Sequence, residues 1–109
     1  MNIEDSKKII ANIINLWAKG ALKEAKKYCK KILLQYRDKM DISLRKNITQ
    51  KLIMIAVELE EYDMALWWVD WFKSVLKEDK NDNLKDIIEI EEIRKNVVRE
   101  KTTHHTHKN

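Results

Sequence analysis

The residues that could carry out chemistry in this chain are few and lie far apart. Its three histidines, His104, His105 and His107, fall within the last six residues, and their imidazole nitrogens could bind zinc, nickel or copper. No cysteine lies near them, and a polar tail offers no second set of side chains to orient the imidazoles. We therefore predict no metal site and no other cofactor, and we expect these histidines to belong to a flexible tail.

The single cysteine, Cys29, lies beside Tyr28 and Ile32 on the apolar face of a predicted helix. A buried thiol explains Cys29 better than a nucleophile, because no histidine outside the tail could accept its proton. Acidic residues form two groups further along the chain: Glu58, Glu60, Glu61 and Asp63, and then Glu89, Glu91 and Glu92. Neither group contains the Glu-x-x-His pair of di-iron proteins, and one glycine is too few for a phosphate-binding loop. The sequence therefore predicts a protein that is not an enzyme.

Aromatic residues are concentrated in residues 62–72, and tryptophan is enriched at the energetic centres of protein interfaces. At about 100° per residue, Ala65, Trp68 and Phe72 centre one apolar face of a helix. Trp67 and Trp71 lie one turn apart, beside the polar stripe on the other side. Either neighbouring helices cover these two tryptophans, or a partner protein does so, including a second copy of the chain. We predict that four residues of this segment bind a partner: Trp67, Trp71, Leu66 and Asp70.

A second candidate surface is basic and lies on the helix predicted for residues 21–39. One face of that helix is apolar, and the rest presents six basic side chains: Lys23, Lys26, Lys27, Lys30, Lys31 and Arg37. Such a row could follow the phosphates of a nucleic acid with salt-dependent affinity, or it could attract an acidic protein. The other interpretation is an ordinary solvated face, since lysine is common throughout the chain.

Charge is unevenly distributed between the two halves of the chain. Residues 1–50 contain 12 Lys and Arg against 5 Asp and Glu, whereas residues 51–109 contain 10 against 13. The net charges are therefore +7 and −3, which together give the +4 of the whole chain. This asymmetry can favour an acidic partner, a nucleic acid, or a head-to-tail assembly of identical subunits, and it can equally be accidental.

The elements that must position these residues are predicted to be helices. The chain of 109 residues has one glycine and no proline, whereas the turns of a sheet are rich in those residues. Apolar residues recur at intervals of three and four, and this spacing predicts five helices at about residues 6–19, 21–39, 43–60, 62–77 and 84–100. Candidate N-caps precede three of them: Asp5 or Ser6, Asp41 or Ser43, and Asp82 or Asn83. Gly20 is a candidate left-handed residue at the end of the first helix.

The length of the chain suits one compact domain. We expect residues 1–100 to form this helical domain and residues 101–109 to be a disordered polar tail. The first residues carry acidic side chains and no apolar run long enough for a signal peptide, and no segment approaches the roughly 18 apolar residues of a membrane span. We therefore expect a cytoplasmic, intracellular protein that does not insert into a membrane.

The chain repeats part of its own pattern at an offset of 40 residues. At this offset residues 22–25 align with 62–65, and five further pairs of apolar residues coincide: Ile13 with Ile53, Ile14 with Met54, Tyr28 with Trp68, Cys29 with Val69, and Ile32 with Phe72. Two helical hairpins followed by a closing helix are the arrangement of a short solenoid. The predicted fold class is therefore all-α, with about five antiparallel helices in stacked hairpins, as a short solenoid or a bundle.

The two turn segments, residues 20–25 and 60–65, resemble the turn between the helices of a tetratricopeptide repeat. Leu22 and Tyr62 match the residue at the turn, and Ala25 and Ala65 match the small residue that lets the two helices approach closely. The resemblance covers about residues 6–78, although the spacing of 40 exceeds the family's repeat of about 34 residues and the repeat-closing proline is absent. The resemblance implies tetratricopeptide-like geometry and a non-catalytic adaptor that binds a peptide or helix of another protein.

The leading hypothesis for function is a helical-repeat adaptor that binds another protein through Trp67 and Trp71. The lysine-rich helix would attract an acidic partner toward them. Two alternatives come from other classes of protein. A small nucleic-acid-binding protein would use the basic face, and a self-assembling structural subunit would join the basic half of one copy to the acidic half of the next.

Overall fold

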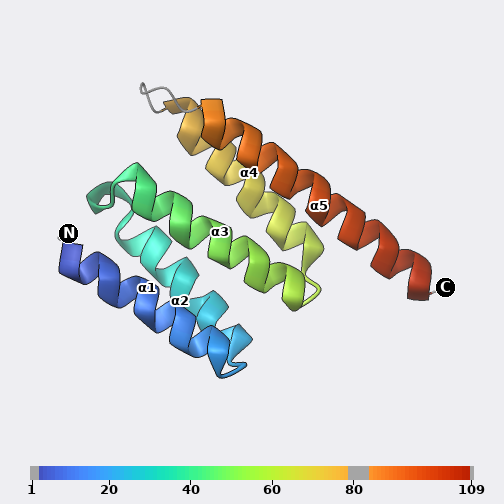
Figure 1. Cartoon of the computed structure of the whole chain (residues 1–109), viewed down its shortest axis with the longest axis horizontal. Helices are drawn as coiled ribbons and strands as arrows, with labels where there is room; N and C mark the ends of the chain where they lie inside the picture. Colours follow the sequence, from blue (N-terminus) through green and yellow to red (C-terminus); the bar gives the residue numbers. More distant parts are fainter. Residues whose placement is uncertain (1–2, 79–83, 109) are drawn as a thin grey trace.

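α-Helices make up nearly the whole of the described chain. The computed structural model describes residues 3–78 and 84–108, and within these ranges it contains no β-strand (Figure 1). Its elements are α1 (Ile3–Ala18), α2 (Leu22–Gln35), the 3₁₀ helix η1 (Arg37–Lys39), α3 (Ile42–Glu58), α4 (Tyr62–Glu78) and α5 (Leu84–Lys108). The all-α fold predicted from the sequence is confirmed.

α2 is shorter than predicted. It ends at Gln35, and the chain continues through the 3₁₀ helix η1 rather than through another α-helical turn. A 3₁₀ helix is wound more tightly than an α-helix, so the following residues leave the axis of α2. Met40, directly after η1, is buried in the core, and the chain can then turn back into α3.

The predicted N-caps have different outcomes. Asp41 caps α3, because its carboxylate accepts a hydrogen bond of 2.8 Å from the backbone N–H of Leu44. The candidates at residues 5–6 lie inside α1 instead of before it. The candidates at residues 82–83 lie outside the described part of the chain.

α5 is longer than predicted. It continues to Lys108, so residues 101–108 have a helical backbone where the sequence predicted a disordered tail. Neither proline nor glycine interrupts the helix in this stretch, and a helix that is already formed extends at little cost. The extension is also tied to the preceding helix, because the Lys101 ammonium pairs with the Asp63 carboxylate of α4 at 2.6 Å.

The turns between α1 and α2 and between α3 and α4 have the same backbone geometry. Gly20 and Glu60 are both left-handed, with φ of 78° and 63°. In each turn the N–H of this residue donates to the carbonyl three positions earlier, at 2.9 Å. The next N–H donates to the carbonyl five positions earlier, at 2.9 Å in the first turn and 2.8 Å in the second, which is the Schellman pattern. The left-handed end predicted at Gly20 is confirmed, and Glu60 is its counterpart 40 residues later.

The five helices of the described chain form two layers (Figure 1). α1, α3 and α5 make one layer, in which the indole N–H of Trp17 donates to Glu58 at 3.1 Å and Lys46 of α3 pairs with Glu89 of α5 at 3.0 Å. α2 and α4 make the other layer. The Cα dimensions of 48 × 33 × 19 Å fit this arrangement, since a helix with its side chains is about 10 Å across.

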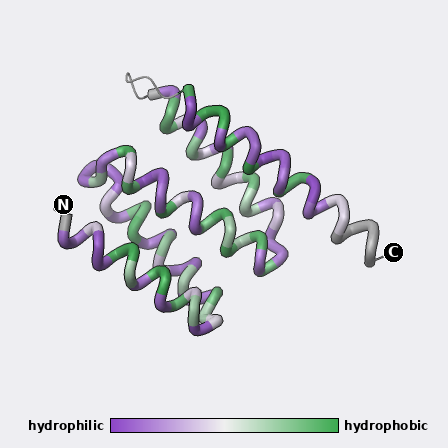
Figure 2. Tube along the Cα trace, viewed as in Figure 1, coloured by the Kyte–Doolittle hydropathy of each residue, from purple (hydrophilic) through white to green (hydrophobic). Residues whose placement is uncertain are grey.

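The core lies between the two layers, where each helix packs chiefly against its neighbours in the chain. Figure 2 shows hydrophobic and hydrophilic residues alternating along each helix, as expected when a helix buries one face. Trp68 and Phe72 are the largest fully buried side chains. Ala25 and Ala65 are also fully buried, and their small size allows the helices of each hairpin to approach closely.

Candidate functional site

An apolar groove lies between α2 and α4. Its volume is about 400 Å³, and its lining residues are Lys30 and Leu34 of α2 and Asp63, Met64, Trp67 and Trp68 of α4. Leu34, Met64 and Trp67 are 66%, 40% and 55% exposed. Single exposed apolar residues are common, but neighbouring ones that line one groove are typical of a binding site. The groove therefore offers apolar area that this chain leaves open to solvent.

Trp68 supports the other two tryptophans of α4. It is 2% exposed, and its ring meets the ring of Trp67 edge-on, with centroids 4.9 Å apart and an interplanar angle of 84°. Trp71 meets Trp68 in a similar way, at 5.3 Å and 77°. Because a buried ring holds Trp67 in place, the exposed indole has little side-chain entropy to lose when a partner binds.

Trp71 has different surroundings from Trp67, although the two are one helical turn apart. It is half-buried and packs against the core. The guanidinium carbon of Arg37 lies 5.9 Å from the centroid of the Trp71 ring, which is within the range of a cation–π contact. Of the two predicted tryptophan anchors, Trp67 is open to a partner, and Trp71 is partly covered by residues of its own chain.

Leu66 and Asp70 lie on the side of α4 that faces α5. Leu66 is half-buried and packs against the core, and the Asp70 carboxylate lies 3.8 Å from the guanidinium of Arg94 in α5. On the same side, Lys73 pairs with Glu91 of α5. The four residues predicted as one partner site are therefore divided between two sides of α4, and among them only Trp67 lines the groove.

Of the six predicted basic residues, Lys30 lines the groove. Lys26 is half-buried, and its ammonium pairs with Glu61 at 2.8 Å. The remaining five are partly or fully exposed: Lys23, Lys27, Lys30, Lys31 and Arg37. Within the part of the chain that the structure describes, none of these five forms an ion pair with a carboxylate. The aromatic surface and the basic surface, predicted separately, thus meet at this groove, which Trp67 and Lys30 both line.

Sequence reasoning did not find Leu34. A signal for it exists in the run Ile32-Leu33-Leu34, because three consecutive residues span about 200° of a helix and cannot all face the same core. Ile32 and Leu33 are buried, and Leu34 is the residue that turns to solvent. Met64, which is 40% exposed, also lines the groove beside Trp67.

The thiol of Cys29 is fully buried, as predicted. Burial raises its pKa to about 12, against a smaller lowering by the charge of Lys51. The thiol therefore stays protonated at neutral pH and is a poor nucleophile. Among the described residues, no group of three His, Cys, Asp or Glu side chains is placed to hold a metal ion. The side chains of His104, His105 and His107 lie outside that part of the chain.

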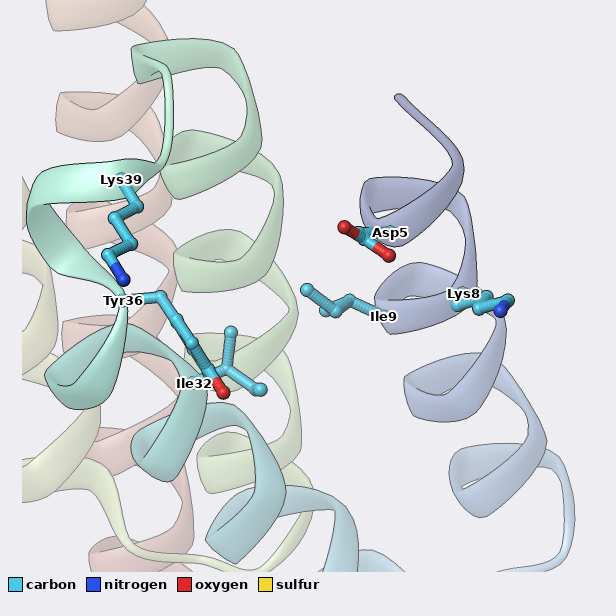
Figure 3. A pocket seen from close by; sticks show the side chains of 6 residues that line it. All are labelled: Asp5, Lys8, Ile9, Ile32, Tyr36 and Lys39. Atoms are coloured by element: carbon cyan, nitrogen blue, oxygen red, sulfur yellow. The ribbon is translucent and has the colours of Figure 1, made fainter. Parts of the chain in front are cut away.

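A hollow at one end of α1 and α2 differs from the groove in its chemistry. Figure 3 shows the residues that line it: Asp5, Lys8, Ile9, Ile32, Tyr36 and Lys39. Ile9 points toward Ile32 and Tyr36, whereas Lys8 points away from them (Figure 3). The mixture of both charges with two buried isoleucines gives this hollow no single chemical preference.

A further groove lies in the other layer, between α3 and α5. Its apolar residues include Met54, which is 53% exposed, together with Val57 and Ile93. None of the residues lining this groove is aromatic, so it lacks the residue type that contributes most to binding at protein interfaces. The groove between α2 and α4 is for this reason the stronger candidate.

No described helix combines the length and the apolar character needed to span a bilayer. Comparison of the chain with protein-family models, with curated proteins and with solved structures finds no match.

Proposed function

We propose that this chain is a non-catalytic interaction module that binds another protein in the groove between α2 and α4. The observation that carries the proposal is the exposure of Trp67. More than half of this side chain faces solvent, while its ring rests on the buried ring of Trp68. Tryptophan is enriched at binding hot spots because it buries a large area at a small cost in side-chain entropy. We assign Trp67 the role of hydrophobic anchor.

The shape of the groove favours a rod-like ligand. Leu34 lies on one helix and Met64 and Trp67 on the other, so a helical or extended segment placed between α2 and α4 would cover all three. Both walls are helices that pack on the core, and such walls hold a binding geometry better than loops do. The site is therefore largely formed before a partner arrives.

We also infer that the hairpins α1–α2 and α3–α4 are tetratricopeptide-like units. Support comes from the two turns, which share the same hydrogen bonds and a left-handed residue at positions 40 apart. Further support comes from Ala25 and Ala65, which are both fully buried at equivalent positions. A pair of such units with a closing helix would act as an adaptor rather than as an enzyme.

The substitution Trp67→Ala tests the proposed function. Affinity capture from an extract of the source cells, treated with nuclease, identifies proteins retained by the wild-type chain. Each purified candidate is then titrated against wild type and Trp67→Ala. We expect the Kd to rise about thirtyfold or more, since truncating a hot-spot residue costs at least about 2 kcal/mol. The free energy of unfolding should change little, because the replaced side chain is largely exposed.

Met54→Ala is the matched control, because Met54 has a similar exposed fraction in the other layer. It should leave the Kd unchanged. An unchanged Kd for Trp67→Ala, or an equal loss in both variants, would contradict the assignment of the groove. Retention that disappears with nuclease would instead indicate nucleic-acid binding by the basic face. A sedimenting mass above that of the monomer, reduced by Trp67→Ala, would identify the partner as a second copy.

A further inference from the structure

A stripe of positively charged side chains lies along α2. Lys23, Lys27 and Lys30 recur at intervals of four and three residues, so they share one side of the helix with Leu34. Arg37 lies beyond the end of α2, in η1, where it contacts Trp71. At the rise of an α-helix the side of α2 from Lys23 to Leu34 is about 17 Å long. Within the described chain these basic groups have no carboxylate at ion-pair distance.

The carboxylates near the groove are already paired with other cations. Glu61 pairs with Lys26 at 2.8 Å, and Asp63, which lines the groove, pairs with Lys101 of α5 at 2.6 Å. Glu24 is exposed and lies three residues from Lys27, so it borders the stripe, although within the described chain it forms no ion pair. The three lysines of the stripe outnumber this carboxylate, and this side of α2 thus keeps a net positive charge.

The α4 wall of the same groove is mainly apolar. It consists of Met64 and Trp67, with Trp68 beneath them, and of Asp63, whose carboxylate pairs with Lys101. The charged residues Asp70 and Lys73 of α4 face α5 instead. A ligand in the groove therefore meets hydrocarbon and an indole on one side, and ammonium groups along one edge. An amphipathic helix with an apolar stripe and an acidic flank matches both walls at once.

We infer that the groove binds an acidic amphipathic helix of about three turns from a partner protein, an inference that rests on the proposed function. The length follows from the span of about 17 Å from Lys23 to Leu34 and the helical pitch of about 5.4 Å. Apolar residues of the bound helix contact the three exposed apolar side chains of the groove, and its carboxylates lie along the α2 stripe. A nucleic acid would match the charge, but its polar backbone would cover the apolar side chains.

A displayed library of peptides of about 18 residues tests this charge preference. Each member keeps apolar residues at helical positions i, i+3, i+4, i+7 and i+11, and the other positions vary among Glu, Lys and Gln. The library is selected separately on the wild-type chain, on Lys23→Glu/Lys27→Glu/Lys30→Glu and on Trp67→Ala. Circular dichroism and urea denaturation check that every variant folds.

A fourth selection uses a control variant with the same change in net charge. Lys19→Glu/Lys77→Glu/Lys85→Glu reverses three exposed lysines that do not line the groove. Wild type and this control should both enrich Glu over Lys beside the apolar stripe. The variant Lys23→Glu/Lys27→Glu/Lys30→Glu should bind the same peptides more weakly, by up to about tenfold, and should itself enrich peptides with Lys at these positions. Trp67→Ala should enrich no peptide.

Other outcomes would overturn the inference in distinguishable ways. Peptides that depend on Trp67 but show no preference for Glu would refute the acidic helix and leave the proposed function standing. Enrichment that does not depend on Trp67, or no enrichment on any form of the chain, would refute both the acidic helix and the proposed function. Acidic peptides that bind equally well after Gln replaces their apolar stripe would show binding of polyanions in general, and would also refute the inference.

Discussion

The two hairpins of this chain share a turn and differ in the side chains that they expose. At the offset of 40 residues, Lys27 of α2 corresponds to Trp67 of α4, and Lys31 corresponds to Trp71. The first hairpin therefore presents ammonium groups where the second presents indoles. Four pairs of buried positions keep apolar side chains in both hairpins: Ile13 with Ile53, Ala25 with Ala65, Cys29 with Val69, and Ile32 with Phe72.

The difference shows how a repeated framework can form an asymmetric site. Packing restricts the buried positions to apolar residues of suitable size, whereas the exposed positions are free to change. The groove lies where the two exposed faces meet, so it takes its charge from α2 and its aromatic surface from α4. Neither hairpin could provide this combination alone.

Truncation of equivalent core residues should give the largest effect on stability. We expect Phe72→Ala to lower the free energy of unfolding by about 3–5 kcal/mol and Ile32→Ala by about 2–5 kcal/mol, because each leaves a cavity in a packed interior. Urea denaturation measures both, with the exposed Ser74→Ala as control. A small loss at one position and a large loss at the other would break the equivalence of the two hairpins.

At both turns glycine should be more stable than alanine. Gly20→Ala should destabilise by about 1 kcal/mol, because alanine is strained at a φ of 78° even though no atom lies within 4 Å of the added Cβ. Glu60→Gly should be more stable than Glu60→Ala by about the same amount, since glycine relieves the left-handed strain. Both Glu60 variants lose the glutamate side chain. The difference between their free energies of unfolding, from thermal or urea denaturation, therefore reports the backbone strain at position 60. A neutral Gly20→Ala would show that the two turns are not equivalent.

The smallest expected effect concerns the contact between the second hairpin and α5. A hydrogen bond from Lys73 holds the pKa of Glu91 below its ordinary value of 4.5. The pair therefore stabilises the fold fully when the pH is above the pKa that Glu91 has in the unfolded chain. This stabilisation is lost as the pH falls through the lower pKa that Glu91 has in the folded chain. Glu91→Gln should slightly reduce the acid-dependent loss of stability, because an exposed pair contributes little. A carboxyl titration of Glu91 by NMR with a midpoint at or above 4.5 would contradict this account.

The helices and the first turn could be predicted from the sequence because their signals are local. Apolar spacing at threes and fours identifies a helix, and the only glycine of the chain marks the left-handed residue at position 20. The second turn has the same geometry at Glu60, a residue type that rarely adopts it. The end of α2 depends on burial of Met40, which no local pattern indicates.

The candidate site could be predicted only in part, because it depends on how two helices pack. Helical spacing placed Trp67 away from the core, and the structure agrees. The same spacing predicted that Trp71 would be as exposed as Trp67, whereas Arg37 and the core cover part of the Trp71 ring. Leu34 enters the groove only because α2 lies beside α4, and the pattern of a single helix does not contain that information.

The stacking of helices in chain order has a consequence for how the protein forms and opens. Contacts between successive helices join residues that are close in sequence, so little loop-closure entropy is lost before each contact forms, and such chains fold within about microseconds to milliseconds. Opening can also begin at one end without disturbing the other. α1 packs less extensively on α2 than α3 does. α2 and α4 both pack on α3, so the groove stays intact when α1 opens.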